Sequence, residues 1–411
     1  MTKLEAFLKK VYETNEFYQN IVKEYNITDP TDITQYPILT RQQLQENRYN
    51  MFSKGYKSKY FVQQLRRQTS SGSSGVPVNV YWDYKNWYAS NLSLWRKRRQ
   101  WYGIHPSDKY VVFTLNAFNL KADGETVYCV NDPKNILSVN ISLLQNKEQY
   151  KKLAEIINEF NPIWLYVQPF VLNRLIETYK FYGLTKPAEL RYIESVGELL
   201  SSDLKRRAVE FFKVPLANMY GSEEMNGIAY ECPEHHMHIL GNNVLIEIKN
   251  DTGIHESGEG EAIITNLNNT AMPLIRYNQG DIIALNKTII SCPYDCHLII
   301  QQIIGRSLDC IILDDGTEVN SYAFLEIISE LNNQFRDIVI EYQFVYRKLQ
   351  KMINCLVRLK PEGTAWFPNI KKAIIELYKH KFSCIKIGFE VKLVDNIGIN
   401  GEKHKIFKTV T

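Results

Sequence analysis

Residues 163–196 read IWLYVQPFVLNRLIETYKFYGLTKPAELRYIESV, and this stretch decides the fold that we expect. Residues 163–167 are a short apolar run typical of a buried strand. Residues 171–182 have helical character and precede Gly183, a common left-handed helix stop. Residues 192–196 are strand-like again. The order strand, helix, strand predicts a mainly parallel α/β layer.

The segments on either side continue this alternation. Residues 148–160 carry apolar side chains on one helical face, and residues 202–212 have the pattern of a further helix. Residues 214–219 then lead into Tyr220. Apolar residues at helical spacing also predict helices within the first 50 residues.

Short strands punctuated by Gly and Asn come next, at residues 244–248, 261–264 and 281–285. They favour an antiparallel or barrel-like subdomain.

The pattern changes after Gly305-Arg306. Residues 338–345 and 352–359 are two β-rich runs that can form a hairpin, a helix is expected over 369–380, and a strand over 385–394. A module of about 100 residues with this content predicts a small second α+β domain.

Composition limits the classes of function. The chain has 411 residues, with Lys+Arg 49 against Asp+Glu 45, a balance too even to favour nucleic acid or a membrane surface as the main partner. We find no apolar run of about 18 residues and no signal-like N-terminus. Seven Cys in a long chain favour reduced thiols, so we expect a cytoplasmic protein.

Thr69 to Pro77 read TSSGSSGVP, a run rich in Ser and Gly. Glycines permit close backbone approach, and exposed N–H groups and hydroxyls suit phosphate oxygens. No Lys-Ser or Lys-Thr follows the second Gly, so the run is not a Walker loop. Taken alone, it is either a phosphate loop or a flexible linker.

Five segments, in order along the chain, resemble motifs of the adenylate-forming superfamily, which includes acyl- and aryl-CoA ligases, luciferases and peptide-synthetase adenylation domains. The segments are this Ser/Gly run, YGSEE at 220–224, MPLIRY at 272–277 followed by Gly280-Asp281, GRSLD at 305–309 and EKHK at 402–405. Residues 193–198 and 229–238 (AYECPEHHMH) are similar to phenylacetate–CoA ligases and CapK-type capsule-biosynthesis proteins. The resemblance covers essentially the whole chain.

The resemblance implies an α/β fold in two parts. The first, residues 1–306, is a large N-terminal domain that binds ATP and the acid, with mixed sheets, helices and a β-barrel-like subdomain. The second, residues 307–411, is a small mobile α+β lid.

The same resemblance implies an enzyme that uses ATP to convert a carboxylic acid, aryl or arylacetic, into an acyl-AMP with release of pyrophosphate. The acyl group then passes to a thiol, either coenzyme A or a carrier-protein phosphopantetheine. An acyl carrier protein is therefore one expected partner besides the acid, and we expect a monomer or homodimer. Two alternatives remain open: transfer to an amine, and a nucleotide-binding homologue without catalysis.

The implied roles fall on matching positions. Lys403, Glu224 and Arg306 are the expected catalytic residues: Lys403 neutralises the forming charge, Glu224 holds Mg²⁺ and Arg306 lies near the ribose and phosphate. Asp281 is expected to accept hydrogen bonds from the ribose hydroxyls. The expected nucleotide-binding residues are Ser70, Ser71, Gly72, Ser73, Ser74, Gly75, Tyr220, Gly221, Ser222, Glu223, Asp281 and Arg306.

Two departures from the superfamily motifs matter. Glu223 stands where these proteins have Thr or Ser, and a carboxylate there repels phosphate unless it helps to hold the metal. The terminal element lacks a Gly-Lys pair, so Lys405 is an alternative to Lys403.

Cys and His residues gather in two places, near 232–238 and near 292–297. Thiolates and imidazoles at such spacing can form a four-coordinate structural Zn²⁺ site. The expected ligands are Cys232, Cys292 and Cys296, with His238 or His235 as the fourth. The alternative is a set of ordinary surface His and buried Cys residues.

Overall fold

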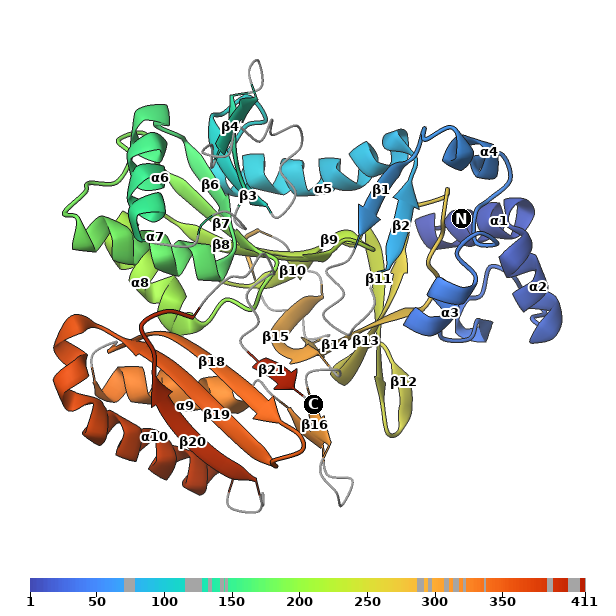
Figure 1. The fold of residues 1–411 in the computed structure, drawn as a ribbon. Coiled ribbons are helices and arrows are strands. Elements are labelled where there is room, and N and C mark those ends of the chain that lie inside the picture. Colours follow the sequence, from blue (N-terminus) through green and yellow to red (C-terminus); the bar gives the residue numbers. More distant parts are fainter. Residues whose placement is uncertain are drawn as a thin grey trace. The chain divides into compact units, whose positions relative to one another are not determined.

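The computed structural model describes residues 1–69, 78–114, 128–131, 135–140, 144, 147–286, 292–294, 298–306, 310–312, 318–320, 323–335, 338–382, 387–397 and 407–410. The chain forms two compact units, each assembled from segments distant in sequence (Figure 1). Unit 1 comprises Met1–Asp108, Tyr192–Leu199 and Ala217–Leu308, and unit 2 comprises Lys109–Arg191, Leu200–Leu216 and Asp309–Thr411. The predicted boundary after residue 306 stays a prediction.

Unit 1 begins with helices and continues into a largely antiparallel sheet. Its helices are α1 (Lys3–Thr14), α2 (Glu16–Glu24), the 3₁₀ turn η1 (Ile33–Gln35), α3 (Arg41–Glu46), α4 (Tyr56–Phe61) and α5 (Tyr84–Tyr102). Its strands are β1 (Arg66–Thr69), β2 (Asn79–Trp82), β7 (Tyr192–Val196), β8 (Leu216–Ser222), β9 (Asn226–Glu231), β10 (Met237–Ile239), β11 (Val244–Asn250), β12 (Gly253–His255), β13 (Gly258–Asn266), β14 (Tyr277–Asn286) and β15 (Ile299–Arg306).

The antiparallel arrangement expected for residues 244–285 is confirmed. The strands lie in the order β12-β11-β13-β14-β15-β10-β9-β8, each antiparallel to its neighbours. The N-terminal helices pack on this sheet: Leu8 and Val11 of α1 share one core with Ile264 of β13 and Tyr277 of β14. A capping box at Thr2 and Glu5 satisfies backbone N–H groups at the start of α1.

The first part of unit 2 is an α/β layer that contains the predicted strand at residues 163–167, whereas the predicted strand at residues 192–196 is β7 of unit 1. Strands β3 (Tyr110–Thr114), β5 (Ile136–Asn140) and β6 (Trp164–Val167) are parallel, while β4 (Tyr128–Asn131) lies antiparallel to β5 at the edge. The helices are α6 (Lys147–Phe160), α7 (Pro169–Phe181) and α8 (Ser202–Phe212). Helix α7 ends before Gly183, whose φ of 62° is the left-handed conformation expected there.

The last part of unit 2 has a sheet and a core of its own. Strands β18 (Val339–Arg347) and β19 (Met352–Leu359) form the predicted hairpin, in the sheet order β20 (Gly388–Leu393), β19, β18, β21 (Phe407–Val410). The other elements are β16 (Cys310–Ile312), β17 (Glu318–Asn320), α9 (Ala323–Gln334), η4 (Pro361–Trp366) and α10 (Phe367–Lys381). Phe324, Phe344 and Ile374 lie at the centre of this core.

Within the described ranges, none of the helices has both the length and the apolar character needed to cross a bilayer.

Candidate nucleotide site and metal centre

The YGSEE motif forms the end of β8 and the turn into β9. The turn is tight: a Cβ atom on Gly221 would lie 2.5 Å from the backbone oxygen of Asn226. Since real Cβ atoms do not approach a carbonyl so closely, the motif needs glycine at this position. The turn leaves Glu223 exposed and buries Glu224, which is 4% exposed. The two neighbouring carboxylates therefore have different environments.

The Gly280-Asp281 motif lies on β14 and contacts the YGSEE motif. Gly280 has a φ of 86°, a left-handed conformation that suits glycine, and the next residue, Asp281, is buried. The Tyr220 hydroxyl donates to Asp281 Oδ2 at 2.6 Å, and Gln279 Nε2 donates to the same oxygen at 2.6 Å. Asp281 and Tyr220, 61 positions apart in the sequence, thus form one polar cluster.

Two more hydrogen bonds fasten the motifs together. Ser222 Oγ donates to Gln279 Oε1 at 2.9 Å, and the Tyr277 hydroxyl lies 3.5 Å from Glu224 Oε1 as a long donor contact. Buried polar groups that satisfy one another hold each other in a fixed geometry. The cluster therefore presents two carboxylates, Glu224 and Asp281, from a rigid sheet.

The start of the Ser/Gly run lies beside this cluster. Gln68, on β1, donates from Nε2 to Glu223 Oε2 at 3.0 Å and to Asn226 Oδ1 at 3.1 Å. Strands β1 and β2 pair from Thr69 opposite Asn79, so the run connects the two strands of a hairpin. Ser70, Ser71, Gly72, Ser73, Ser74 and Gly75 lie outside the described residues.

Arg306 is the partner of Asp281 across the sheet. The register of β14 and β15 places the two residues directly opposite each other. Two expected site residues distant in sequence thus become neighbours on adjacent strands. Asp309, the last residue of the GRSLD segment, and both candidate lysines, Lys403 and Lys405, lie outside the described residues.

Arg276, which precedes β14, ties this strand to the N-terminal region. It forms a buried ion pair with Glu247, with Nη2 to Oε1 at 2.9 Å, and its Nη1 donates to the backbone oxygens of Thr34 and Tyr36. Burial raises the pKa of the Glu247 carboxyl, and Arg276 opposes this effect. Arg276 therefore has a structural role, because it joins the strand that carries Asp281 to the N-terminal region.

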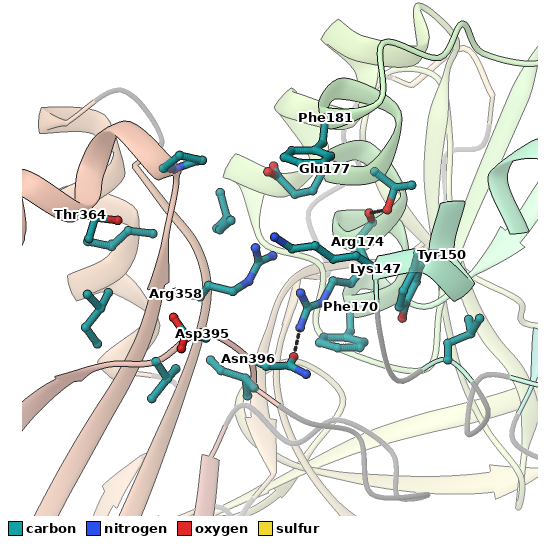
Figure 2. A pocket seen from close by; sticks show the side chains of 18 of the residues that line it. Lys147, Tyr150, Phe170, Arg174, Glu177, Phe181, Arg358, Thr364, Asp395 and Asn396 are labelled. Atoms are coloured by element: carbon teal, nitrogen blue, oxygen red, sulfur yellow. Dashed lines mark hydrogen bonds between the residues drawn. The ribbon is translucent and has the colours of Figure 1, made fainter. Parts of the chain in front are cut away.

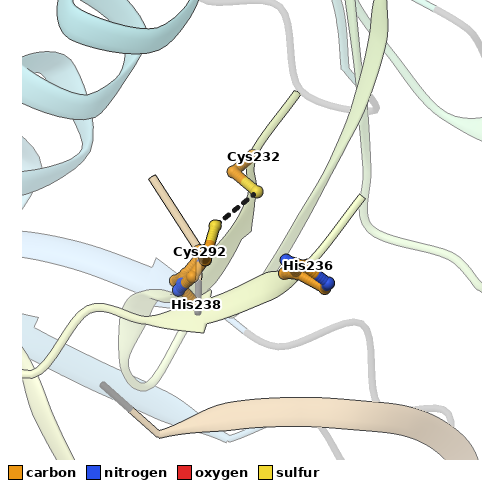
Figure 3. A group of neighbouring side chains, drawn as sticks. All are labelled: Cys232, His236, His238 and Cys292. Carbon is orange, nitrogen blue, oxygen red and sulfur yellow. Dashed lines mark hydrogen bonds between the residues drawn. The ribbon is translucent and has the colours of Figure 1, made fainter. Parts of the chain in front are cut away.

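A second cluster in unit 1 joins two thiols and two imidazoles (Figure 3). The group comprises Cys232, His236, His238 and Cys292, and one ligand atom from each lies within 4.8 Å of the others. The two Sγ atoms are 3.7 Å apart, and Cys292 Sγ lies 3.4 Å from His238 Nε2. Tetrahedral Zn²⁺ with ordinary bond lengths would separate two sulfurs by about 3.8 Å and sulfur from nitrogen by about 3.6 Å.

The chemistry of this group also fits a metal. Burial raises the pKa of the Cys232 thiol to about 11, so a protonated thiol is favoured there unless a cation is nearby. His236 Nδ1 is buried and has no hydrogen-bond partner among the described residues. A buried imidazole nitrogen without a partner, on a residue beside two thiols, is typical of a metal ligand.

The group contains Cys232, Cys292 and His238 of the expected ligand set and adds His236. His235 has its ring turned toward Glu231, with Nδ1 3.5 Å from the carboxylate, and lies outside the group, whereas His236 lies inside it. A φ of 62° at His235 forms the turn after Cys232, and the chain then enters β10. Residues 236 and 238 share a face because side chains alternate along an extended chain. That alternation is the signal that identifies His236. Cys296 lies outside the described residues.

Comparison with known proteins places these sites in context. Residues 68–260 match the model of the family described as AMP-binding enzyme. The chain is 24% identical over 368 residues to protein CapK of Staphylococcus aureus, with 86% of this chain and 77% of CapK aligned. It is 22% identical over 415 residues to phenylacetate-coenzyme A ligase of Thermus thermophilus, with 97% and 89% aligned.

The fold is also known from a solved structure. The chain resembles 2-hydroxyisobutyryl-CoA ligase in the postadenylation state in complex with R3-HIB-AMP, with a TM-score of 0.77, 15% identity, and 99% of this chain and 88% of that chain covered. The protein therefore has the fold of this ligase, and residues 68–260 match the AMP-binding enzyme model. In sequence the chain is similar to CapK and to the phenylacetate-coenzyme A ligases, as the resemblance predicted.

Proposed function

We propose that this protein is an AMP-forming acid–thiol ligase. It activates a carboxylic acid with ATP, releases pyrophosphate and transfers the acyl group from the acyl-adenylate to a thiol. The observation that supports this is that hydrogen bonds join the YGSEE segment to residues 277–281. Tyr220 and Gln279 both donate to Asp281, and Glu224 lies beside Tyr277. The names of the relatives support an aryl or arylacetic acid as the substrate.

Adenylation requires the protein to position the reactants and stabilise charge, and it requires no covalent bond to the protein. Attack of the acid carboxylate on the α-phosphorus forms the acyl-AMP and breaks the bond to pyrophosphate, so negative charge builds on the phosphate oxygens. Asp281 accepts hydrogen bonds from the ribose hydroxyls, and the loop from Ser70 to Gly75 holds the outer phosphates. Lys403 and Arg306 neutralise the developing charge.

Glu224 is the residue that we assign to Mg²⁺. Magnesium in such sites binds one or two carboxylates together with phosphate oxygens, and would supply positive charge beside the leaving pyrophosphate. A carboxylate held by a buried environment suits that task. Glu223, which is exposed and accepts a hydrogen bond from Gln68, remains at the edge of the phosphate loop.

We also propose that Cys232, His236, His238 and Cys292 hold a structural Zn²⁺ ion. Four protein ligands close the coordination shell, which is typical of structural rather than catalytic zinc. Cys232 directly follows β9, the strand after the YGSEE turn, and β10 contributes His238. The ion would therefore fix one end of the β9–β10 hairpin behind the nucleotide motif.

The first test of the main proposal is pyrophosphate release with ATP and Mg²⁺ across aryl, arylacetic and fatty acids, without an acceptor. Release that depends on one class of acid supports adenylation and identifies the acid. ATP binding without acid-dependent release for any acid, repeated with coenzyme A present, would instead favour a nucleotide-binding homologue. AMP formation stimulated by coenzyme A but not by amines distinguishes the thiol acceptor from an amine.

Asp281→Ala is expected to weaken ATP binding about tenfold or more, because a charge-assisted pair of hydrogen bonds to the ribose is lost. Calorimetric titration with ATP measures this effect. Asp251→Ala, in the exposed turn between β11 and β12, is the matched control and should bind like the wild type. Unchanged affinity in a folded Asp281→Ala protein would remove Asp281 from the ribose role.

A further inference from the structure

Unit 2 contains a cavity of about 500 Å³ that no motif of the nucleotide site lines (Figure 2). One wall comes from helices α6 and α7, and the other comes from β18, β19, η4 and the segment after β20. Cavities of about 300–1,000 Å³ are the usual size for small-molecule sites. Its lining residues all belong to unit 2, whereas Tyr220, Glu224 and Asp281 belong to unit 1.

Three cationic side chains enter this cavity from opposite walls. Lys147 at the start of α6, Arg174 on α7 and Arg358 on β19 direct their nitrogen atoms toward a common region (Figure 2). Like charges that converge in a partly dry space repel one another. An anion placed among them would relieve this repulsion.

The carboxylates around the cavity offset part of this charge. Glu341, with its side chain 2% exposed, pairs with both Arg174 and Arg358, so one negative charge serves two guanidinium groups. Glu177 lines the cavity and lies 3.9 Å from Arg207, which has a closer ion pair with Asp203 at 3.0 Å. Asp395 is exposed, so water screens its charge. Glu341 therefore balances only one of the two guanidinium charges, and Lys147 is exposed and screened by water like Asp395.

One donor in this region lacks an acceptor. Arg358 Nε donates to Glu341 Oε2 at 2.7 Å, but Arg358 Nη2 is buried and has no hydrogen-bond partner within the described ranges. Buried polar groups are nearly always paired, and a guanidinium does not lose its proton. Arg358 Nη2 is thus a donor that an oxygen atom of a ligand would satisfy.

Aromatic rings supply the remaining wall. Lys147 Nζ lies 5.2 Å from the centroid of the Phe181 ring, and Arg174 Cζ lies 5.5 Å from that of Phe170. The rings hold the cations over their faces and offer apolar surface to a bound molecule. A ligand with an anionic group and an apolar or aromatic body matches both parts of the lining.

We propose that this cavity binds a small phosphate monoester with an aromatic or apolar body. Its phosphate oxygens accept hydrogen bonds from Lys147 and Arg358, and its body lies against Phe170 and Phe181. A phosphate monoester carries about −1.5 to −2 charge at pH 7, which the three convergent cations would attract. Because the walls come from α6–α7 and from the C-terminal sheet, the ligand links these two parts of unit 2.

The test uses phenyl phosphate as the probe and calorimetric titration of the full chain. Lys147→Met is expected to weaken binding about tenfold, since a charge-assisted bond to phosphate is lost. Lys152→Met, an exposed lysine on the same helix outside the cavity, is the matched control and should bind like the wild type. Asp281→Ala should also bind like the wild type, which separates this cavity from the nucleotide site.

Arg358→Lys adds a second arm, because it keeps the charge but removes Nη2, and it should weaken phenyl phosphate binding by a similar factor. Lys147 is exposed, so the Lys147→Met result stands even if the Arg358 variant misfolds. No binding to the wild type at millimolar probe, or equal binding by wild type and Lys147→Met, would overturn the proposal. Displacement of phenyl phosphate by coenzyme A would identify the acceptor as the source of the phosphate, and no displacement would identify a separate phosphorylated metabolite.

Discussion

Lys403→Ala is expected to lower acid-dependent pyrophosphate release by about 100-fold or more, while ATP affinity changes by less than about threefold. The lysine acts on charge that develops only in the transition state, so its loss reduces turnover rather than ground-state binding. The measurement is steady-state pyrophosphate release with the acid identified in the panel, together with calorimetric titration of ATP.

Lys405→Ala is the control for this prediction. It lies two positions away in the same basic segment, and it should retain activity within about threefold if Lys403 is the residue that reaches the phosphates. The opposite pattern, in which Lys403→Ala has normal activity and Lys405→Ala is impaired, would move the catalytic role to Lys405. Equal activity of both variants and the wild type would contradict a catalytic lysine in this segment.

The metal centre gives the second large effect. Purified wild-type protein is expected to contain one zinc ion per chain, and Cys232→Ser is expected to lose it. The melting temperature should fall by about 10 °C, because binding energy of a structural ion is folding energy. Elemental analysis and a thermal scan measure the two results without any activity assay. Cys355→Ser, a buried cysteine on β19 away from the cluster, should keep its zinc.

A pair of neighbouring histidines sharpens this test. His236→Asn should lower zinc content or affinity at least about tenfold, whereas His235→Asn should leave both unchanged. The two variants carry the same substitution at adjacent positions, so they differ only in which histidine is replaced. Wild-type protein without zinc, or zinc retained equally by Cys232→Ser and His236→Asn, would refute the proposed centre.

Much of the fold could be predicted because its signals are local. The apolar run of β6, the helical pattern of α7 and its glycine stop depend on neighbouring residues, and the structure has each of them where the sequence placed it. The hairpin of β18 and β19 was predictable for the same reason. Local patterns also fixed the order of the motifs along the chain.

The contacts within the site were not predictable in this way. The bonds from Gln279 to Tyr220 and Asp281 depend on the register between distant strands, and a shift of one residue would turn these side chains to the other face. The choice between His235 and His236 depends on one left-handed residue in a turn. Spacing alone gave the neighbourhood of the metal cluster but not its members.

The contacts of the N-terminal region matter for the choice of truncation boundary when this protein is expressed. The family match begins at residue 68, but Arg276 bonds to backbone oxygens of Thr34 and Tyr36, and the Tyr18 hydroxyl donates to the Pro273 backbone oxygen. A chain begun at residue 68 would lose the two backbone oxygens that accept from Arg276. It would also expose the buried Arg276 guanidinium next to β14, the strand that carries Asp281. The first forty residues therefore belong to the smallest piece worth expressing, although no motif lies within them.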